Sequence, residues 1–134
     1  MNAETNHQMP PENLKLTALP YDFSVCKLDD ARLIDFSRAF TFAAKTDEEV
    51  SLVCLTDDVP EYTLARDDGW RAFRISGTLD FSLVGILSRI TALLADADIG
   101  IFAISTYNTD YVLTRKTDFM RALVLLRMAG YEAN

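Results

Sequence analysis

The clearest hydrophobic pattern in the chain lies over residues 81–98 and predicts a helix. Apolar residues recur there three and four positions apart, at Leu83, Leu87, Ile90 and Leu94. That spacing places them on one face of a helix, as expected when the face packs on a core. We therefore predict a deeply packed helix with Leu87 in the middle of its buried face.

Shorter patterns surround this helix in the second half of the chain. Residues 70–75, 101–106 and 109–115 are rich in apolar residues at strand spacing, and Tyr107-Asn108 predicts a tight turn between the last two. A final helix is expected between an N-cap at Thr117 and Gly130. The order β-α-β-β-α favours an antiparallel sheet with helices on one face. A ferredoxin-like unit needs one more, closing strand, which we expect from the first half or from another subunit.

The first half of the chain is richer in strands and poorer in helices. Four strands are predicted, over residues 14–18, 23–28, 40–45 and 50–55. Short helical turns are expected at 31–36 and at 46–49, each with a polar N-cap residue. Residues 1–13 are polar and contain Pro10-Pro11, so we predict a disordered tail.

Composition and charge narrow the class of partner. The chain has 134 residues, 49% of them hydrophobic, which is ordinary for a globular domain. Its formal net charge is −7 and its basic residues form no run, so nucleic acid and anionic membrane surfaces are poor partners. No secretory signal or membrane-spanning run is found. Cys26 and Cys54 lie in apolar runs and predict buried thiols in a reducing, cytoplasmic compartment.

Residues that could carry catalysis or bind a metal are not grouped in the sequence. The single histidine, His7, lies in the predicted tail, so a histidine-activated nucleophile is not expected. No His/Cys cluster suits zinc, and no glycine-rich phosphate loop occurs. The acidic pairs Asp57-Asp58 and Asp67-Asp68 flank loops, and Asp68-Gly69 indicates a turn. We therefore expect no catalytic residues, no metal and no cofactor, and we do not expect an enzyme.

Two polar segments could instead bind a small molecule. The first, residues 77–85, joins a strand to the main helix, and its glycines allow a ligand to approach the backbone. Asp80 and Ser82 are candidate N-caps there, and the free N–H groups of a helix start suit a carboxylate. The second, residues 105–110, is a polar hairpin in which Asp110 could bind an ammonium group. Ordinary turn chemistry also explains this hairpin, but together the segments would suit a zwitterionic amino acid.

These segments resemble an ACT domain, the small βαββαβ module that binds amino acids in regulated enzymes and sensors. The greatest similarity is to small stand-alone bacterial proteins of the CASTOR-type ACT family. The resembling stretches begin at Leu16, Thr46, Gly69, Leu79 and Ile104 and read LTALPYDFSVC, TDEEVSLVC, GWRAFRISG, LDFSLVGIL and ISTYNTDYVL.

The resemblance implies an α+β fold with two tandem ferredoxin-like units. The first unit would span residues 14–68 and be degenerate, since it has no glycine loop, and the second would span 69–134. It also implies an amino acid bound between ACT units, in a cytoplasmic homo-oligomer. The ligand-binding positions carried over are Thr78, Asp80, Phe81, Ser82, Val84, Gly85, Ser105, Thr106 and Asp110. The alternative is an assembly module with the same fold and no ligand.

Overall fold

A computed structural model describes residues 14–76 and 85–134 of the chain. Within these residues eight strands form one mixed sheet, in which six follow the order β3-β4-β2-β5-β1-β8 and the β6–β7 hairpin joins through β5. The strands are β1 (Lys15–Ala18), β2 (Phe23–Leu28), β3 (Phe42–Lys45), β4 (Val50–Leu55), β5 (Ala65–Ser76), β6 (Ile101–Ser105), β7 (Asp110–Arg115) and β8 (Glu132–Ala133). The helices are α1 (Ile86–Asp96) and α2 (Lys116–Met128), with short 3-10 turns η2 (Ala31–Leu33) and η3 (Thr56–Asp58).

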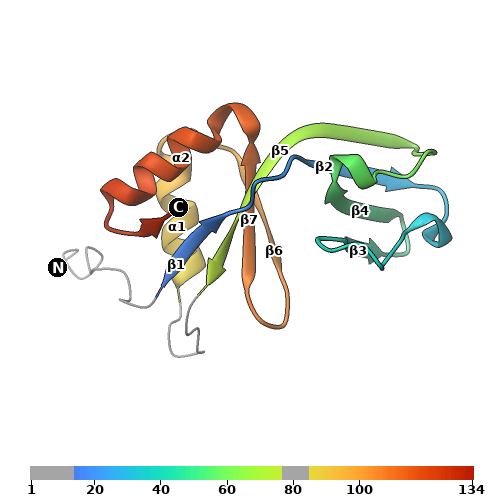
Figure 1. The fold of residues 1–134 in the computed structure, drawn as a ribbon, viewed down its shortest axis with the longest axis horizontal. Helices are drawn as coiled ribbons and strands as arrows, with labels where there is room; N and C mark the ends of the chain where they lie inside the picture. Colours follow the sequence, from blue (N-terminus) through green and yellow to red (C-terminus); the bar gives the residue numbers. More distant parts are fainter. Residues whose placement is uncertain (1–13, 77–84) are drawn as a thin grey trace.

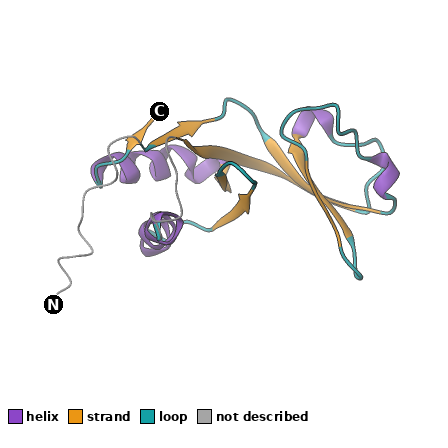
Figure 2. Ribbon diagram, turned by 90° about the horizontal axis from the view of Figure 1, so that it is seen from below, coloured by secondary structure: helices purple, strands orange, loops and turns teal. Residues whose placement is uncertain are grey.

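The sheet bends into two lobes at opposite ends of an elongated molecule (Figure 1). The N-terminal lobe contains β2, β3, β4 and the first part of β5. The C-terminal lobe contains both α-helices, β1, β6, β7, β8 and the rest of β5. The long strand β5 passes from one lobe to the other, as the view from below also shows (Figure 2).

Strand β5 begins earlier than the sequence predicts, because the expected turn at Asp68-Gly69 is a β-bulge. The pairing with β2 shifts by one residue between Phe23↔Trp70 and Val25↔Asp67. Gly69 lies in this shift with a φ of +88°, a conformation that favours glycine. The bulge lets one strand pair with β2 in the first lobe and with β1 and β7 in the second. β5 therefore runs without a break through the predicted boundary between residues 68 and 69.

The C-terminal lobe has the predicted β-α-β-β-α order and two further strands. Strand β1, from the first half of the chain, pairs with β5 and closes this unit, which is one of the two expected sources of the closing strand. Residues 132–133 add the short strand β8, which the sequence did not predict. Strand β1 lies between β5 and β8, antiparallel to the former and parallel to the latter. The first half of the chain thus also contributes a strand to this lobe.

Both α-helices pack on the same face of the C-terminal sheet, as predicted. The core between them includes Ile90, Leu94 and Leu126 from the helices and Phe73 and Val112 from the sheet. Ile90 is completely buried and is the centre of the buried face of α1. Leu87, expected at that centre, is only partly buried at the edge of this core.

The helix ends differ in part from the predicted ones, and the candidate N-caps of α1, Asp80 and Ser82, lie outside the described residues. Helix α1 has Gly85 at its N-cap and turns at its C-terminal end through Asp98, whose φ is +61°. Arg115, rather than the expected Thr117, is the N-cap of α2. Gly130 follows α2 with a φ of +99°, and the next residue, Tyr131, donates its N–H to the Leu126 carbonyl at 3.0 Å. The C-terminal end of α2 is therefore terminated by a glycine, as predicted.

The N-terminal lobe has a small core of its own. Cys26 and Cys54 are buried in it beside Leu28, Val50 and Leu52, so the prediction of buried thiols is confirmed. Burial raises the pKa of both thiols, that of Cys54 to about 12.

The connection at residues 46–49 is a hairpin loop between β3 and β4, not a helical turn. The Thr46 hydroxyl nevertheless accepts N–H bonds from Glu48 and Glu49, at 3.1 and 3.2 Å. It therefore closes the turn in the manner expected of an N-cap.

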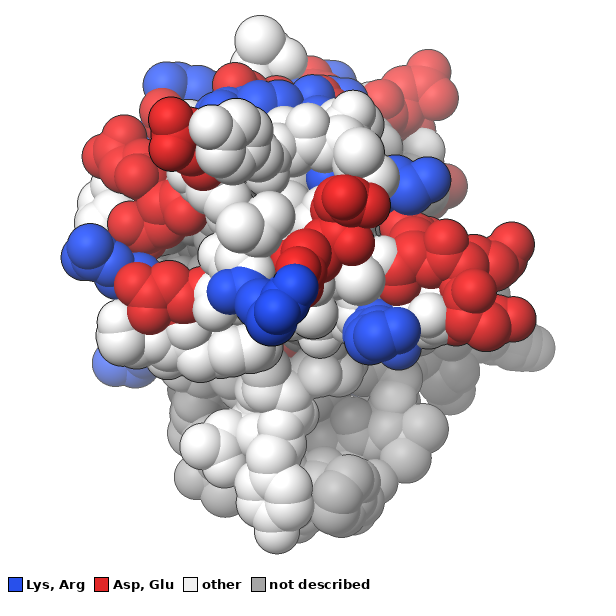
Figure 3. Space-filling view, turned by 90° about the vertical axis from the view of Figure 1, so that its right-hand side faces the viewer, with Lys and Arg blue, Asp and Glu red and all other residues white. Residues whose placement is uncertain are grey.

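Acidic residues are concentrated in the first half of the molecule. Residues 14–68 carry twice as many acidic as basic side chains, whereas the two are nearly balanced over residues 69–134. The end of the N-terminal lobe accordingly shows many acidic residues among uncharged ones (Figure 3). The C-terminal lobe therefore repels a ligand carboxylate less than the N-terminal lobe does.

Candidate ligand-binding site

The structure describes four of the nine predicted binding residues. Gly85, Ser105, Thr106 and Asp110 lie within the described residues. The other five, Thr78, Asp80, Phe81, Ser82 and Val84, lie outside them.

Three of the four meet at the end of the β6–β7 hairpin. Ser105 and Asp110 are paired across the two strands, and the Ser105 hydroxyl donates to Asp110 Oδ1 at 2.5 Å. The loop between them closes on itself, because the Thr106 N–H and hydroxyl both donate to the Thr109 carbonyl, at 2.8 and 3.0 Å. Local strand pairing therefore brings these side chains together, as the sequence predicts.

The hairpin is attached to the end of β5. The Thr109 hydroxyl donates to the Ile75 carbonyl, which lies one residue before the end of that strand. Tyr107, at the tip, is fully exposed and makes no contribution to this attachment.

Asp110 lies on the face of the sheet that the helices cover. Side chains alternate along a strand, so Asp110 shares a face with Val112, which is buried under α1 and α2. The start of α1 and the tip of the β6–β7 hairpin lie at the same end of the C-terminal lobe (Figure 1). The half-buried Asp110 carboxylate and the positive N-terminal end of α1 thus lie at the same end of this lobe.

Gly85 contributes through its backbone. Its φ of +91° places it in the left-handed region, and its carbonyl accepts the first helical N–H bond, from Arg89 at 2.9 Å. A glycine N-cap has no side chain to occupy the N–H groups of the first turn of α1. Those groups are suited to an anion such as a carboxylate.

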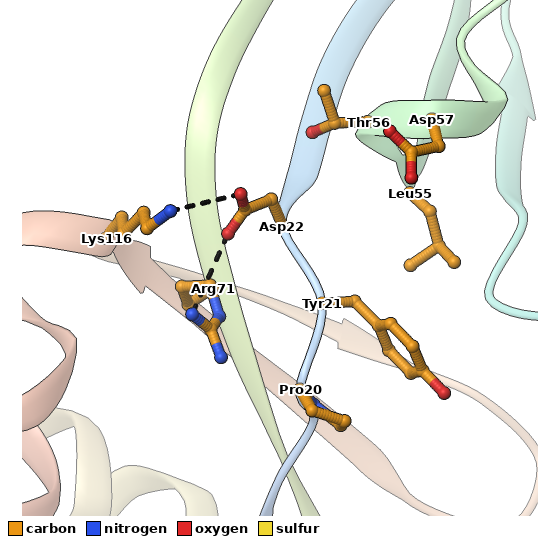
Figure 4. Close-up of a pocket in the computed structure, with 8 residues that line it drawn as sticks. All are labelled: Pro20, Tyr21, Asp22, Leu55, Thr56, Asp57, Arg71 and Lys116. Carbon is orange, nitrogen blue, oxygen red and sulfur yellow. Dashed lines mark hydrogen bonds and ion pairs between the residues drawn. The ribbon is translucent and has the colours of Figure 1, made fainter.

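The structure also shows a hollow that the sequence analysis missed. It lies where the two lobes meet and is lined by residues from four separate stretches of chain (Figure 4). The lining residues are Pro20, Tyr21, Asp22, Leu55, Thr56, Asp57, Arg71 and Lys116. No local motif joins these positions, so only the fold could reveal the site.

The acidic pair Asp67-Asp68 lies in strand β5 rather than in a solvated turn. Asp68 Oδ1 accepts a hydrogen bond from the buried Ser24 hydroxyl at 2.6 Å and also contacts Arg66. These two interactions lower the pKa of Asp68, and a hydrogen bond from Arg115 lowers that of Asp67. Both carboxylates are therefore engaged in structural pairs.

Among residues 14–76 and 85–134, no group of three potential metal ligands is close enough to hold an ion. Neither α-helix in this part of the chain is long and apolar enough to cross a membrane.

A comparison with protein families identifies one matching segment. Residues 65–128 match the model of the ACT domain. This segment spans β5, α1, β6, β7 and α2, and so includes the hairpin and the start of α1. No curated protein matches the chain.

Solved structures share the fold over most of the chain. A protein from Agobacterium tumefaciens has a TM-score of 0.79 and 29% identity, over 92% of this chain and 94% of that one. A Vibrio cholerae protein of unknown function has a TM-score of 0.70 and 17% identity, over 88% and 91% of the two chains.

A third similar structure is the aspartate kinase of Clostridium acetobutylicum, an allosteric enzyme. Its TM-score is 0.61 at 17% identity, over 87% of this chain but only 33% of the kinase. At this identity the likeness shows the fold alone. The chain thus contains a segment that matches the ACT domain, within a mixed, ferredoxin-like fold that it shares with these solved structures.

Proposed function

We propose that this protein is a sensor module that binds an amino acid where the β6–β7 hairpin meets the start of α1. The observation that carries the proposal is the half-buried Asp110 carboxylate, which lies at the same end of the C-terminal lobe as the first turn of α1, whose N-cap Gly85 has no side chain. Asp110 would bind the ammonium group, and the helix start would bind the carboxylate. A zwitterion leaving water needs both charges satisfied, and these two groups supply both.

The proposal extends to the class and assembly of the protein. We place it with the CASTOR-type proteins, with a degenerate first ACT-like unit over 14–68 and a second over 69–134. It would act as a binding protein rather than an enzyme, in the cytoplasm, where the two free buried thiols stay reduced. A homo-oligomer is expected because β6 and β3 each pair with one strand only among the described residues.

The experiment is calorimetry of the intact protein with each of the twenty amino acids, followed by the Asp110→Asn variant with any that bind. Asparagine is also a good hairpin residue, so the fold should persist, as circular dichroism can check. Breaking a buried charge pair should weaken binding by about 2–5 kcal/mol, at least about thirtyfold in Kd. Asp96→Asn is the matched control, because it removes the same charge at an exposed position near the far end of α1.

Two results would count against the proposal. Equal affinity of the wild type and Asp110→Asn would remove Asp110 from the site. An absence of heat with all twenty amino acids would leave the alternative, an assembly module joined through the open edges of β6 or β3. Light scattering then tests that alternative, because an assembly module must form species larger than the 15.0 kDa chain, and a monomer would exclude it.

A further inference from the structure

The hollow between the lobes has the size of a small-molecule site. Its volume is about 390 Å³, within the range of roughly 300–1,000 Å³ typical of ligand pockets. One wall comes from the connection between β1 and β2 and from the start of η3. The facing wall comes from Arg71 on β5 and Lys116 at the start of α2 (Figure 4).

The two cationic side chains of the facing wall, Arg71 and Lys116, both contact the carboxylate of Asp22. Lys116 Nζ lies 3.1 Å from Asp22 Oδ2, and Arg71 Nη1 lies 3.7 Å from Asp22 Oδ1. Arg71 is the more buried of the two, with 25% of its side chain exposed. Its Nε is buried and has no hydrogen-bond partner in the part of the chain that the structure describes. The wall formed by Arg71 and Lys116 therefore carries one positive charge more than Asp22 neutralises, and Arg71 Nε is a hydrogen-bond donor without a partner among the described residues.

The rest of the lining is apolar or bears oxygen atoms. Pro20, Leu55 and the ring of Tyr21 present carbon, while Thr56 and the exposed Asp57 present oxygen (Figure 4). Asp57 makes no ion pair within the described residues. A molecule in the hollow would thus meet positive charge on one side and a carboxylate on the other.

We propose that this hollow binds a small zwitterionic carboxylate, with its carboxylate against Arg71 and Lys116 and its ammonium group towards Asp57. In this arrangement Asp22 occupies the place of the ligand carboxylate when the site is empty. The Lys116–Asp22 pair is about half exposed, and such pairs contribute little to stability, so the exchange of one carboxylate for another is feasible. The site shares no residue with the one around Asp110 and so goes beyond the proposed function.

The role assigned to Asp22 makes an unusual prediction. If Asp22 competes with the ligand, Asp22→Asn should tighten binding, whereas a conventional binding residue would weaken it. Lys116→Gln removes one of the two cations and should weaken binding about tenfold. Lys45→Gln is the matched control, because it removes the same charge at an exposed position on β3 outside the hollow.

The test uses three probes of equal length on the full chain: 4-aminobutyrate, butyrate and butylamine. We expect NMR shifts at Tyr21, Thr56 and Lys116 that are strongest with 4-aminobutyrate, weaker with butyrate and absent with butylamine. Asp22→Asn should lower the Kd for 4-aminobutyrate severalfold, and Asp57→Asn should reduce its advantage over butyrate.

Three outcomes would overturn the inference: no shifts at these residues at 100-fold molar excess, shifts confined to residues 105–110, or weaker binding by Asp22→Asn. The second outcome would leave the proposed function standing. Conversely, if calorimetry detected no binding at the Asp110 site, the NMR shifts at this hollow would be unaffected. Either proposal can therefore be wrong without the other.

Discussion

Replacing Gly69 by alanine tests the bulge that connects the two lobes. An added Cβ at Gly69 would meet no atom within 4 Å, so the change creates neither a clash nor a cavity. What remains is the backbone, because the φ of +88° is one that residues with a side chain rarely adopt. That conformation costs an alanine about 1–2 kcal/mol. Alanine also restricts the unfolded chain, which returns about 0.4–1 kcal/mol.

The net expectation for Gly69→Ala is a loss of about 1 kcal/mol of unfolding free energy. With a urea slope near 2 kcal/mol/M, the denaturation midpoint should fall by about 0.5 M. Gly100→Ala is the matched control, since its added Cβ also meets open space but its φ lies outside the left-handed region. That variant should be neutral or slightly stabilising. Equal midpoints for the two variants, or a loss above about 3 kcal/mol for Gly69→Ala, would refute the reasoning.

Three further predictions concern the cores and one carboxylate. Ile90→Ala should cost about 2–5 kcal/mol and Leu87→Ala clearly less, because only Ile90 is fully buried; chemical denaturation that ranks them the other way would contradict the structure. Cys26 and Cys54 should react slowly with iodoacetamide in the native protein and fast in denaturant, because burial raises both pKa values; rapid native labelling would show that their strands open. The pKa of Asp68 is lowered on folding, so the ionised carboxylate stabilises the fold fully at pH values above the ordinary pKa of 3.8, and this stabilisation is lost as the pH falls below that value. The difference in unfolding free energy between the wild type and Asp68→Asn should therefore shrink at low pH, and a constant difference would exclude this linkage.

Local patterns in the sequence were sufficient for most elements of the C-terminal lobe. The helical spacing around Ile90 and Leu94 predicted α1, and the polar turn at Tyr107-Asn108 predicted the β6–β7 hairpin. Strand β8 was missed because a strand of two residues has no readable alternation. The first part of β5 was missed because its charged residues resemble a turn. Pairing with β2 and the hydrogen bond from Ser24 to Asp68 hold it extended instead.

The two candidate sites also differ in whether local sequence patterns could predict them. Ser105, Thr106 and Asp110 could be grouped from the sequence because a hairpin brings near neighbours together. The hollow around Arg71 and Lys116 could not, because its walls meet only when the two lobes are in place. Long-range sites of this kind require the sheet order, which the sequence did not predict.

The position of β1 has a consequence for the order of folding. Leu16 pairs with Ile75 and with Ala133, so this early segment depends on partners that are synthesised much later. Pairing of β2, β3 and β4 involves a shorter stretch and can form first, since closing a short loop loses less entropy. During synthesis β1 would therefore wait, with Leu14 and Leu16 exposed, until β5 and then β8 have emerged. A nascent chain that exposes β2, β3 and β4 but not yet β5 should consequently protect β2 and β4 from a protease while leaving β1 open to cleavage.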